Sequence, residues 1–372
     1  MKLERGINLG GYLSQCVHNT EHYDAFIQEE DIRKIASMGF DHVRLAIDYE
    51  VLEDEYGRTR EEGFAYVTRV VEWCKRQGLN IVLDLHKAYG YDFNNAGDKG
   101  KNILFTNKMV QKRFVNLWIK IAEHYANETH VAFELLNEVV EQENAEAWNL
   151  LIAETVDAIR RIARDTIIIY GGIQWNSVKT LKLLEKPKDE NILFTFHFYE
   201  PLLFTHQKAH WVPTISQTED IYYPEAMDYY RTKSLPIGYQ GEVVCKAQSQ
   251  TMGTEFITEM VMEAVTAAKN AGVTLYCGEF GVIDQAPVED TLRWFTDVDT
   301  VFRQFGIGLH LVFRRIVGNL FAYTADLEPE FGVDLHRRFT VFALYESNEL
   351  RTLGRVHRPS GLFVQCAAYG LG

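Results

Sequence analysis

Eight short runs of apolar residues recur along the chain, separated by longer segments in which apolar and charged positions mix. The runs are dense in Val, Ile, Leu and Phe and show little polar alternation, which is typical of parallel strands covered on both faces. The predicted strands are Gly6–Gly11, His42–Ile47, Asn80–Leu85, Val131–Leu136, Thr166–Tyr170, Ile192–Phe198, Val273–Cys277 and Gly308–Phe313.

The segments between these runs show the period of amphipathic helices. Several of them end at a glycine, which a helix C-terminus favours. Strands that alternate with helices indicate βαβ units, and eight such units predict an α/β protein with a closed (β/α)8 TIM barrel. The predicted helices are Glu29–Met38, Gly63–Gln77, Lys108–Tyr125, Ala145–Ala163, Thr254–Asn270 and Val288–Phe305.

Two regions do not follow this alternation. Glu200–Met252 comes after the sixth strand and is rich in His, Trp and Tyr. A long loop insertion there would lie on the catalytic face of a barrel, where its aromatic rings could stack on a ligand or only pack the loop on itself. We expect residues 1–334 to form the barrel domain. For the C-terminal segment 335–372, one interpretation is a partly disordered or non-native tail.

The composition of the chain limits the kinds of partner that we expect it to bind. The chain has 372 residues, 47% of them hydrophobic, and a formal net charge of −14. That charge argues against nucleic acid, which needs a basic surface. No apolar run is long enough to span a membrane, and no membrane partner is expected. The N-terminus carries no apolar signal region, so either the protein is cytoplasmic or it is secreted and its leader is absent from this chain. The five cysteines include no CxxC pair, which argues against a zinc site.

Two predicted strands end at glutamates. Glu138 follows the fourth strand beside Asn137, and Glu279 follows the seventh. Reactive groups of a parallel barrel lie at these strand ends, and two carboxylates facing one pocket are what cleavage of a glycosidic bond requires. Glu138 would be the general acid, Glu279 the nucleophile, and Asn137 a donor to a sugar hydroxyl next to the reacting carbon. A single glutamate after a strand more often caps a helix, but the pair in this register favours catalysis.

Other strand ends carry polar residues too. Arg44 lies among apolar residues of the second strand and needs a buried partner, either a pocket carboxylate that it would keep ionised or a salt bridge in the barrel core. His86 ends the third strand, and His197 and Tyr199 lie on one side of the sixth. Each histidine alone would more often be a core residue. Together they form a ring of polar groups that a purely structural barrel would not need.

This ordered set resembles the family five glycoside hydrolases, the cellulase-type barrels, over roughly residues 5–334. The first strand, Gly6–Gly11, is similar as well. The resemblance implies retaining hydrolysis of a β-linked glycan without metal or organic cofactor. It also implies Glu138 as acid/base, Glu279 as nucleophile, and a substrate-binding role for the remaining set. Trp175, after the fifth strand, is a further candidate for stacking on sugar, or else for core packing. The substrate-binding set is Arg44, His86, Asn137, Trp175, His197 and Tyr199.

The chain also departs from the family pattern. The family usually has a tryptophan at the end of the eighth strand, whereas no tryptophan follows Trp294 here and Phe313 is the possible replacement.

From the strand-end residues and the resemblance, we interpret the chain as a retaining endo-β-1,4-glucanase, with mannanase or xylanase activity as alternatives on the same scaffold. A glycan-binding protein, or a barrel with an altered pocket that catalyses another acid–base reaction, is the alternative of a different class. Chain-length preference and oligomeric state are left open.

Overall fold

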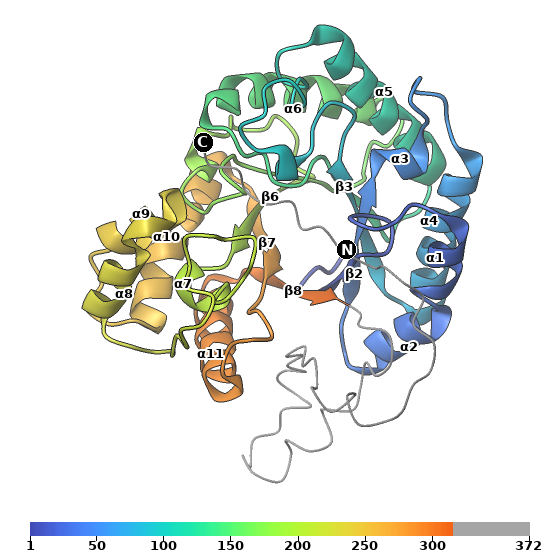
Figure 1. The fold of residues 1–372 in the computed structure, drawn as a ribbon. Helices are drawn as coiled ribbons and strands as arrows, with labels where there is room; N and C mark the ends of the chain where they lie inside the picture. Colours follow the sequence, from blue (N-terminus) through green and yellow to red (C-terminus); the bar gives the residue numbers. More distant parts are fainter. Residues whose placement is uncertain (315–372) are drawn as a thin grey trace.

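Eight parallel strands form a closed barrel in which each strand pairs with the next and β1 pairs with β8 (Figure 1). The computed structural model describes residues 1–314, and for 309–314 it describes the backbone strand alone. The (β/α)8 prediction is confirmed, whereas the predicted segment 335–372 and the side chain of Phe313 lie outside the described residues. The strands are β1 (Arg5–Gly10), β2 (His42–Asp48), β3 (Asn80–Lys87), β4 (Val131–Glu134), β5 (Ile168–Gly171), β6 (Ile192–Phe198), β7 (Thr274–Phe280) and β8 (Gly308–Arg314).

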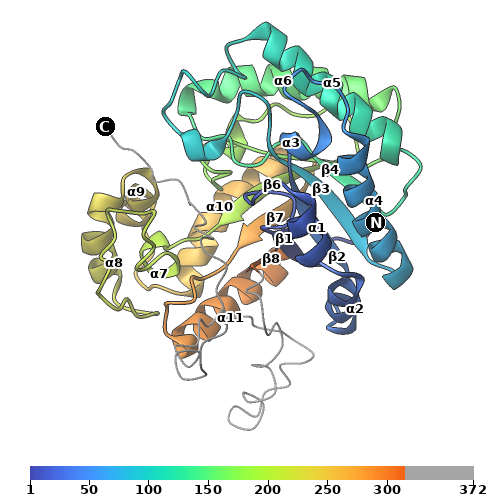
Figure 2. The same cartoon turned by 45° about the vertical axis from the view of Figure 1, so that its right-hand side comes forward.

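Helices surround the barrel (Figures 1 and 2). The six predicted helices are present, with ends that differ from the predictions by at most three residues. Gly78, Gly272 and Gly306 end three of them in the left-handed conformation that a side chain would disfavour. The helices that cover the barrel are α1 (Thr20–Ala25), α2 (Glu29–Ser37), α3 (Tyr49–Leu52), α4 (Glu61–Gln77), α5 (Lys108–Tyr125), α6 (Ala145–Arg160), α10 (Thr254–Ala271) and α11 (Val288–Phe305).

Several strand ends differ from the predictions, and two of these differences bear on the site. β7 does not end at Cys277 but continues to Phe280, so Glu279 lies within the strand and pairs with His197 of β6. The β7–β8 ladder shifts register between Cys277 and Phe280, and such an irregularity has no signature in an apolar run. β4 ends at Glu134 rather than Leu136, which places the Asn137-Glu138 pair in the loop beyond the ladder.

The region predicted as an irregular loop, Glu200–Met252, is partly helical instead. It contains α7 (Leu202–Thr205), α8 (Met227–Ser234), the 3-10 turn η4 (Leu235–Ile237) and α9 (Tyr239–Lys246), which lie together beside α10 (Figure 1). Helices of eight residues or fewer show too little of an amphipathic period to be recognised, and packing rather than propensity stabilises them. Tyr223 and Tyr230 are buried within this region, so these two rings serve packing.

Two layers fill the barrel interior. The lower one is a small apolar cluster of Val82, Ala132, Ile169 and Tyr276. Residues two apart on a strand point to the same side, so Asp84 lies above Val82 and Glu134 above Ala132. These charged residues belong to a second group of buried side chains, here called the polar layer, which consists of Asn8, Arg44, Asp84 and Glu134. The polar layer forms the base of the candidate site.

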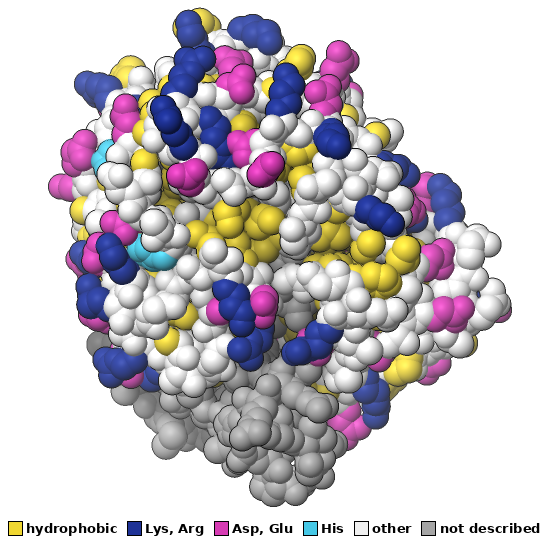
Figure 3. Space-filling model, turned by 180° about the vertical axis from the view of Figure 1, so that it is seen from behind, with side chains coloured by type: hydrophobic (Ala, Val, Ile, Leu, Met, Phe, Trp, Pro, Cys, Tyr) yellow, Lys and Arg dark blue, Asp and Glu magenta, His cyan; other side chains and the backbone are white. Residues whose placement is uncertain are grey.

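Charges of both signs alternate over the surface. On the face turned away from the viewer of Figure 1, Lys and Arg side chains stand among those of Asp and Glu, around a band of hydrophobic side chains (Figure 3). The net charge of −14 is therefore not gathered into one patch on this face. Within residues 1–314, the structure contains no helix with both the length and the apolar character needed to cross a membrane.

Candidate active site

Arg44 is the centre of the polar layer. Its Nε and Nη2 atoms donate to the two carboxylate oxygens of Glu134 at 2.7 and 3.0 Å, and Nη2 also lies 3.0 Å from Asp84 Oδ2. Nη1 donates to Glu279 Oε1 at 2.9 Å. Both interpretations of Arg44 therefore hold, since one guanidinium forms the barrel-core salt bridge and contacts the pocket carboxylate. The amide oxygens of Asn8 and Asn137 accept from it at 3.0 Å as well.

Glu279 is held as an anion. Its Oε1 accepts from Arg44, and its Oε2 accepts from the Tyr199 hydroxyl at 2.9 Å. Burial raises the pKa of this carboxyl, but the charges of His197 and Arg44 outweigh that effect and lower the pKa to about 2. A carboxylate that is ionised at neutral pH and fixed by two donors has the properties of a nucleophile.

Glu138 faces Glu279 across His197. Glu138 Oε1 lies 2.7 Å from His197 Nδ1, and that nitrogen is 3.6 Å from Glu279 Oε2. Burial lowers the pKa of His197, but the charges of Glu279 and Glu138 reverse this and raise it above its ordinary value. An oxygen of Glu138 and one of Glu279 lie within 4.8 Å of each other. Retaining glycosidases hold their carboxyl groups about 5–5.5 Å apart and inverting ones about 6.5–9.5 Å, so the spacing fits retention.

The chain turns sharply at Glu138. Its φ angle is +25°, which is unusual for a residue with a side chain. Tyr91 stabilises the turn, because its hydroxyl donates to the Glu138 carbonyl at 2.9 Å and accepts from the Val140 amide at 2.8 Å. A strained residue persists only where its surroundings hold it, and here the strain aims the Glu138 carboxyl into the pocket.

The loop after β5 is fixed to the Glu138 loop. Gln174, Trp175 and Asn176 all have left-handed backbones, with φ angles of 53, 58 and 53°. The amides of Gln174 and Trp175 donate to the carbonyls of Val140 and Val139, each at 3.2 Å. Trp175 packs partly on the core and partly lines the pocket, so its core packing is confirmed and its stacking on a sugar stays a prediction.

Asn176 contacts the catalytic histidine from this loop. Its Nδ2 lies 3.3 Å from His197 Nε2, and its carbonyl accepts from the His197 amide at 2.9 Å. Asn176 thus fixes the Nε2 end of the imidazole, while Nδ1 faces Glu138. Glycine at 171 makes this contact possible, since a Cβ there would lie 2.3 Å from Asn176 Oδ1.

His86 and Asn137 complete the side of the pocket near β2 and β3. His86 Nδ1 is 2.6 Å from Asp84 Oδ2, and its Nε2 is 3.2 Å from the side-chain nitrogen of Gln15. Burial lowers the pKa of His86, and the Asp84 charge more than offsets this and raises it. Asn137 uses its oxygen for Arg44, and within residues 1–314 its Nδ2 has no protein partner, so it remains a donor for a sugar hydroxyl.

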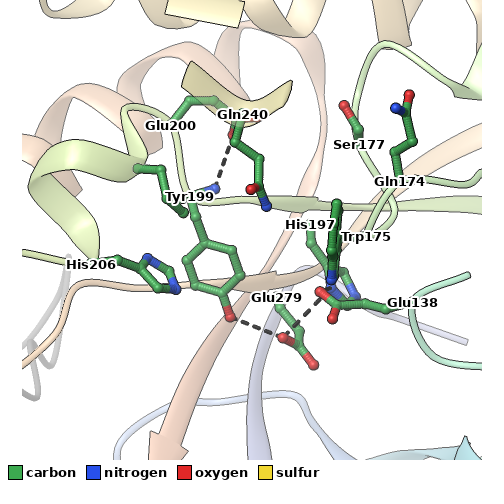
Figure 4. Close-up of a pocket in the computed structure, with 11 residues that line it drawn as sticks. Glu138, Gln174, Trp175, Ser177, His197, Tyr199, Glu200, His206, Gln240 and Glu279 are labelled. Atoms are coloured by element: carbon green, nitrogen blue, oxygen red, sulfur yellow. Dashed lines mark hydrogen bonds and ion pairs between the residues drawn. The ribbon is translucent and has the colours of Figure 1, made fainter. Parts of the chain in front are cut away.

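These groups border a cavity of about 170 Å³. Figure 4 shows Tyr199 and Trp175 on opposite sides of it, with the Glu138 and Glu279 carboxyls at its base. The half-buried His206 has its pKa lowered by desolvation to about 4, so it is a neutral part of the wall. The cavity is lined by Glu138, Gln174, Trp175, Ser177, His197, Tyr199, Glu200, Leu202, His206, Gln240 and Glu279.

In the part of the chain that the structure describes, two groups of side chains have ligand-type atoms close enough to share a cation. One is Glu138, His197 and Glu279 itself, where a hydrogen bond already joins the first two. The other is His18, in the loop between β1 and α1, with Asp48 at the end of β2 and Glu50 in α3. Neither group shows that a metal is bound, and independence from metals and cofactors stays a prediction.

The structure brings every predicted site residue together around the carboxylate pair. Sequence reasoning missed Asp84 and Glu134, although a charge inside an apolar strand was the signal used for Arg44. It also missed Gln15 and Asn176, whose positions depend on left-handed loop backbones that leave no period in the sequence.

A (β/α)8 barrel with two facing carboxylates at its strand ends defines a glycoside hydrolase of the retaining geometry. The family model "Cellulase (glycosyl hydrolase family 5)" matches residues 5–307. The chain belongs to glycosyl hydrolase family 5.

Similar proteins agree with this membership. Endoglucanase C of Acetivibrio thermocellus is 40% identical over 323 residues, covering 83% of this chain and 90% of that protein. Cellodextrinase A of Ruminococcus flavefaciens is 38% identical, covering 82% and 83%. Among solved structures, a hyperthermophilic endo-β-1,4-glucanase in complex with substrate has a TM-score of 0.68 at 21% identity, covering 87% of this chain and 93% of that one. At that identity the likeness shows the fold alone.

Proposed function

We propose that this chain hydrolyses internal β-1,4 bonds of a β-glucan with retention of configuration, with Glu279 as nucleophile and Glu138 as acid/base. The unequal surroundings of the two carboxyls carry the proposal. Glu279 accepts from Arg44 and Tyr199, whereas Glu138 has one side-chain partner, His197. The names endoglucanase and cellodextrinase of the relatives support β-glucan as substrate.

The reaction would proceed in two displacements. Glu279 attacks the anomeric carbon while Glu138 protonates the departing oxygen, which gives a covalent glycosyl ester and frees the leaving sugar. Water then attacks the same carbon, Glu138 takes its proton, and the Glu279 carboxylate leaves. Asn137 would donate to the hydroxyl beside the reacting carbon, and Tyr199 keeps the nucleophile oriented.

The first test is reducing-sugar release from carboxymethyl-cellulose, with mannan and xylan in parallel. We expect cellulose to be the best substrate and its viscosity to fall early, as cleavage of internal bonds requires. Glu138→Ala and Glu279→Ala should each abolish release, whereas Glu143→Ala, an exposed glutamate on the loop that follows Glu138, should not. Release from none of the three polymers would refute hydrolysis, and faster release from mannan or xylan would refute the β-glucan assignment.

Azide distinguishes the two roles on an aryl β-cellobioside. In Glu279→Ala, azide can replace the missing nucleophile and should give the α-azide, an inverted product. In Glu138→Ala, azide should attack the covalent ester in place of activated water and give the β-azide. Exchanged products would reverse the assignment, and absence of rescue in both variants would refute it.

A further inference from the structure

One wall of the cavity carries two polar side chains that the proposed mechanism does not use. Glu200 follows Tyr199, and Gln240 lies in the first turn of α9. In Figure 4 the Gln240 amide points into the space between Tyr199 and Trp175, above the carboxylate pair. Within residues 1–314, this amide has no hydrogen bond to the protein.

The cavity lies on the leaving-group side of the pair. Glu138, which would protonate the departing oxygen, lines it together with Glu279, whereas Arg44, His86 and Asn137 do not. Asn137 is the group expected to bind the sugar that Glu279 attacks. The cavity therefore lies where the leaving part of the substrate must go.

Glu200 is a buried carboxyl with no ion-pair partner in the described part of the chain. It is 8% exposed, and only its Oε2 is hydrogen-bonded, from the Tyr199 amide at 3.0 Å. Burial raises its pKa to about 7. Burial of a carboxyl is costly unless donors satisfy it, and the hydroxyls of a sugar are such donors.

Gln240 is held in place by close helix packing. The next residue is Gly241, where a Cβ would lie 2.0 Å from the Ser234 carbonyl oxygen, so α9 packs directly on the end of α8. Tyr239 on the other side reaches the β5 loop, with its hydroxyl 3.4 Å from Ser177 Oγ. The short helices after β6 thus fix the backbone that carries Gln240 beside the reaction centre.

We propose that Gln240 and Glu200 bind the hydroxyls of the leaving sugar, a neutral β-linked glucosyl unit that packs against Trp175. The proposal rests on the function proposed above, and it assigns substrate binding to the α7–α9 segment. By reversibility, the same site would bind an acceptor sugar that attacks the glycosyl ester in place of water.

The test compares two substrates that share a glycone. Cellotetraose cleaved to cellobiose has a sugar leaving group, and 4-nitrophenyl β-cellobioside does not. We expect Gln240→Ala to lower the ratio of the two kcat/KM values (cellotetraose over aryl cellobioside) about tenfold, the worth of roughly one hydrogen bond. Glu200→Gln keeps the acceptor for the Tyr199 amide and removes the charge, and should lower the ratio about fivefold. Gln250→Ala, on the exposed end of the same segment, is the matched control and should leave the ratio as it is.

A second measurement follows the acceptor reaction. With added cellobiose, the ratio of transglycosylation to hydrolysis of the aryl substrate should fall in Gln240→Ala and stay constant in Gln250→Ala. Equal losses on both substrates, or an unchanged ratio in Gln240→Ala, would overturn the proposal. Failure of the native protein to cleave either substrate would instead overturn the proposed function, so the two failures are distinguishable.

Discussion

Replacement of Arg44 by lysine keeps the positive charge, but we expect it to lower the free energy of unfolding substantially. The guanidinium serves six oxygen atoms, those of Glu134, Asp84, Glu279, Asn8 and Asn137. An ammonium has three N–H donors, carried on a single atom that cannot reproduce the planar fork. Asp84 Oδ2 keeps His86 as a second donor, so at least two of the six acceptors would then remain buried without a donor.

The magnitude follows from the cost of such groups. A buried acceptor left unpaired costs about 1–3 kcal/mol, and breaking a buried ion pair costs about 3–5 kcal/mol. We therefore expect Arg44→Lys to lower the free energy of unfolding by about 3–5 kcal/mol. Loss of the Arg44 contact would also raise the pKa of Glu279 from about 2, since Arg44 is one of the charges that lower it.

Urea denaturation followed by tryptophan fluorescence measures the first effect, and the pH dependence of kcat/KM measures the second. Arg76→Lys is the matched control, because Arg76 is an exposed arginine with one carboxylate partner, Glu29, and its replacement should cost less than about 1 kcal/mol. A loss in Arg44→Lys no larger than in the control would refute the view that the fork of Arg44 maintains the polar layer.

Three further predictions concern the site and the barrel. The pKa of Glu279 is lowered in the folded protein, so its ionised form stabilises the fold above about pH 4.5, and this contribution is lost as pH falls toward about 2. The pH profile of kcat/KM should accordingly show no decrease near pH 4.5. A decrease there without unfolding would contradict the assigned environment of Glu279. Asn176→Leu removes the partner of His197 Nε2. We therefore expect kcat to fall about tenfold and the 15N chemical shifts of the His197 ring to change. Unchanged shifts would contradict the positioning role of Asn176. In Gly63→Ala the new Cβ would lie 1.7 Å from a carbonyl oxygen of α3, so the free energy of unfolding should fall by about 3 kcal/mol. In Gly100→Ala, where the nearest atom is 3.3 Å away, the change should stay within about 0.5 kcal/mol, and equal losses in thermal or urea unfolding would contradict the steric argument.

The barrel could be predicted from the sequence because its strands and long helices each carry a complete period. The polar residues at the strand ends predicted the carboxylate pair, and the structure places Arg44, His86, Asn137, His197 and Tyr199 around it. Structural features that leave no hydrophobic period in the sequence were missed. The register shift that brings Glu279 into β7 is a property of the β7–β8 ladder. The helices α7 to α9 are too short for their pattern to stand out.

Side chains that reach the site from loops were missed for a related reason. Asn176 depends on three successive left-handed residues, and Gln240 depends on the contact of Gly241 with the end of α8. Both arrangements are tertiary. Asp84 and Glu134 are different, since an acidic residue inside an apolar strand is visible in the sequence, and Arg44 should have directed attention to them.

The polar layer and the segment after β6 should tolerate substitutions to different degrees. The polar layer joins β1, β2, β3 and β4 through one guanidinium, so a replacement there affects folding and chemistry together. The wall opposite comes from the segment after β6, which contributes no strand to the barrel. Directed evolution toward a new leaving group should therefore accumulate viable variants in residues 200–252, while the interior of the strands stays nearly invariant under the same selection.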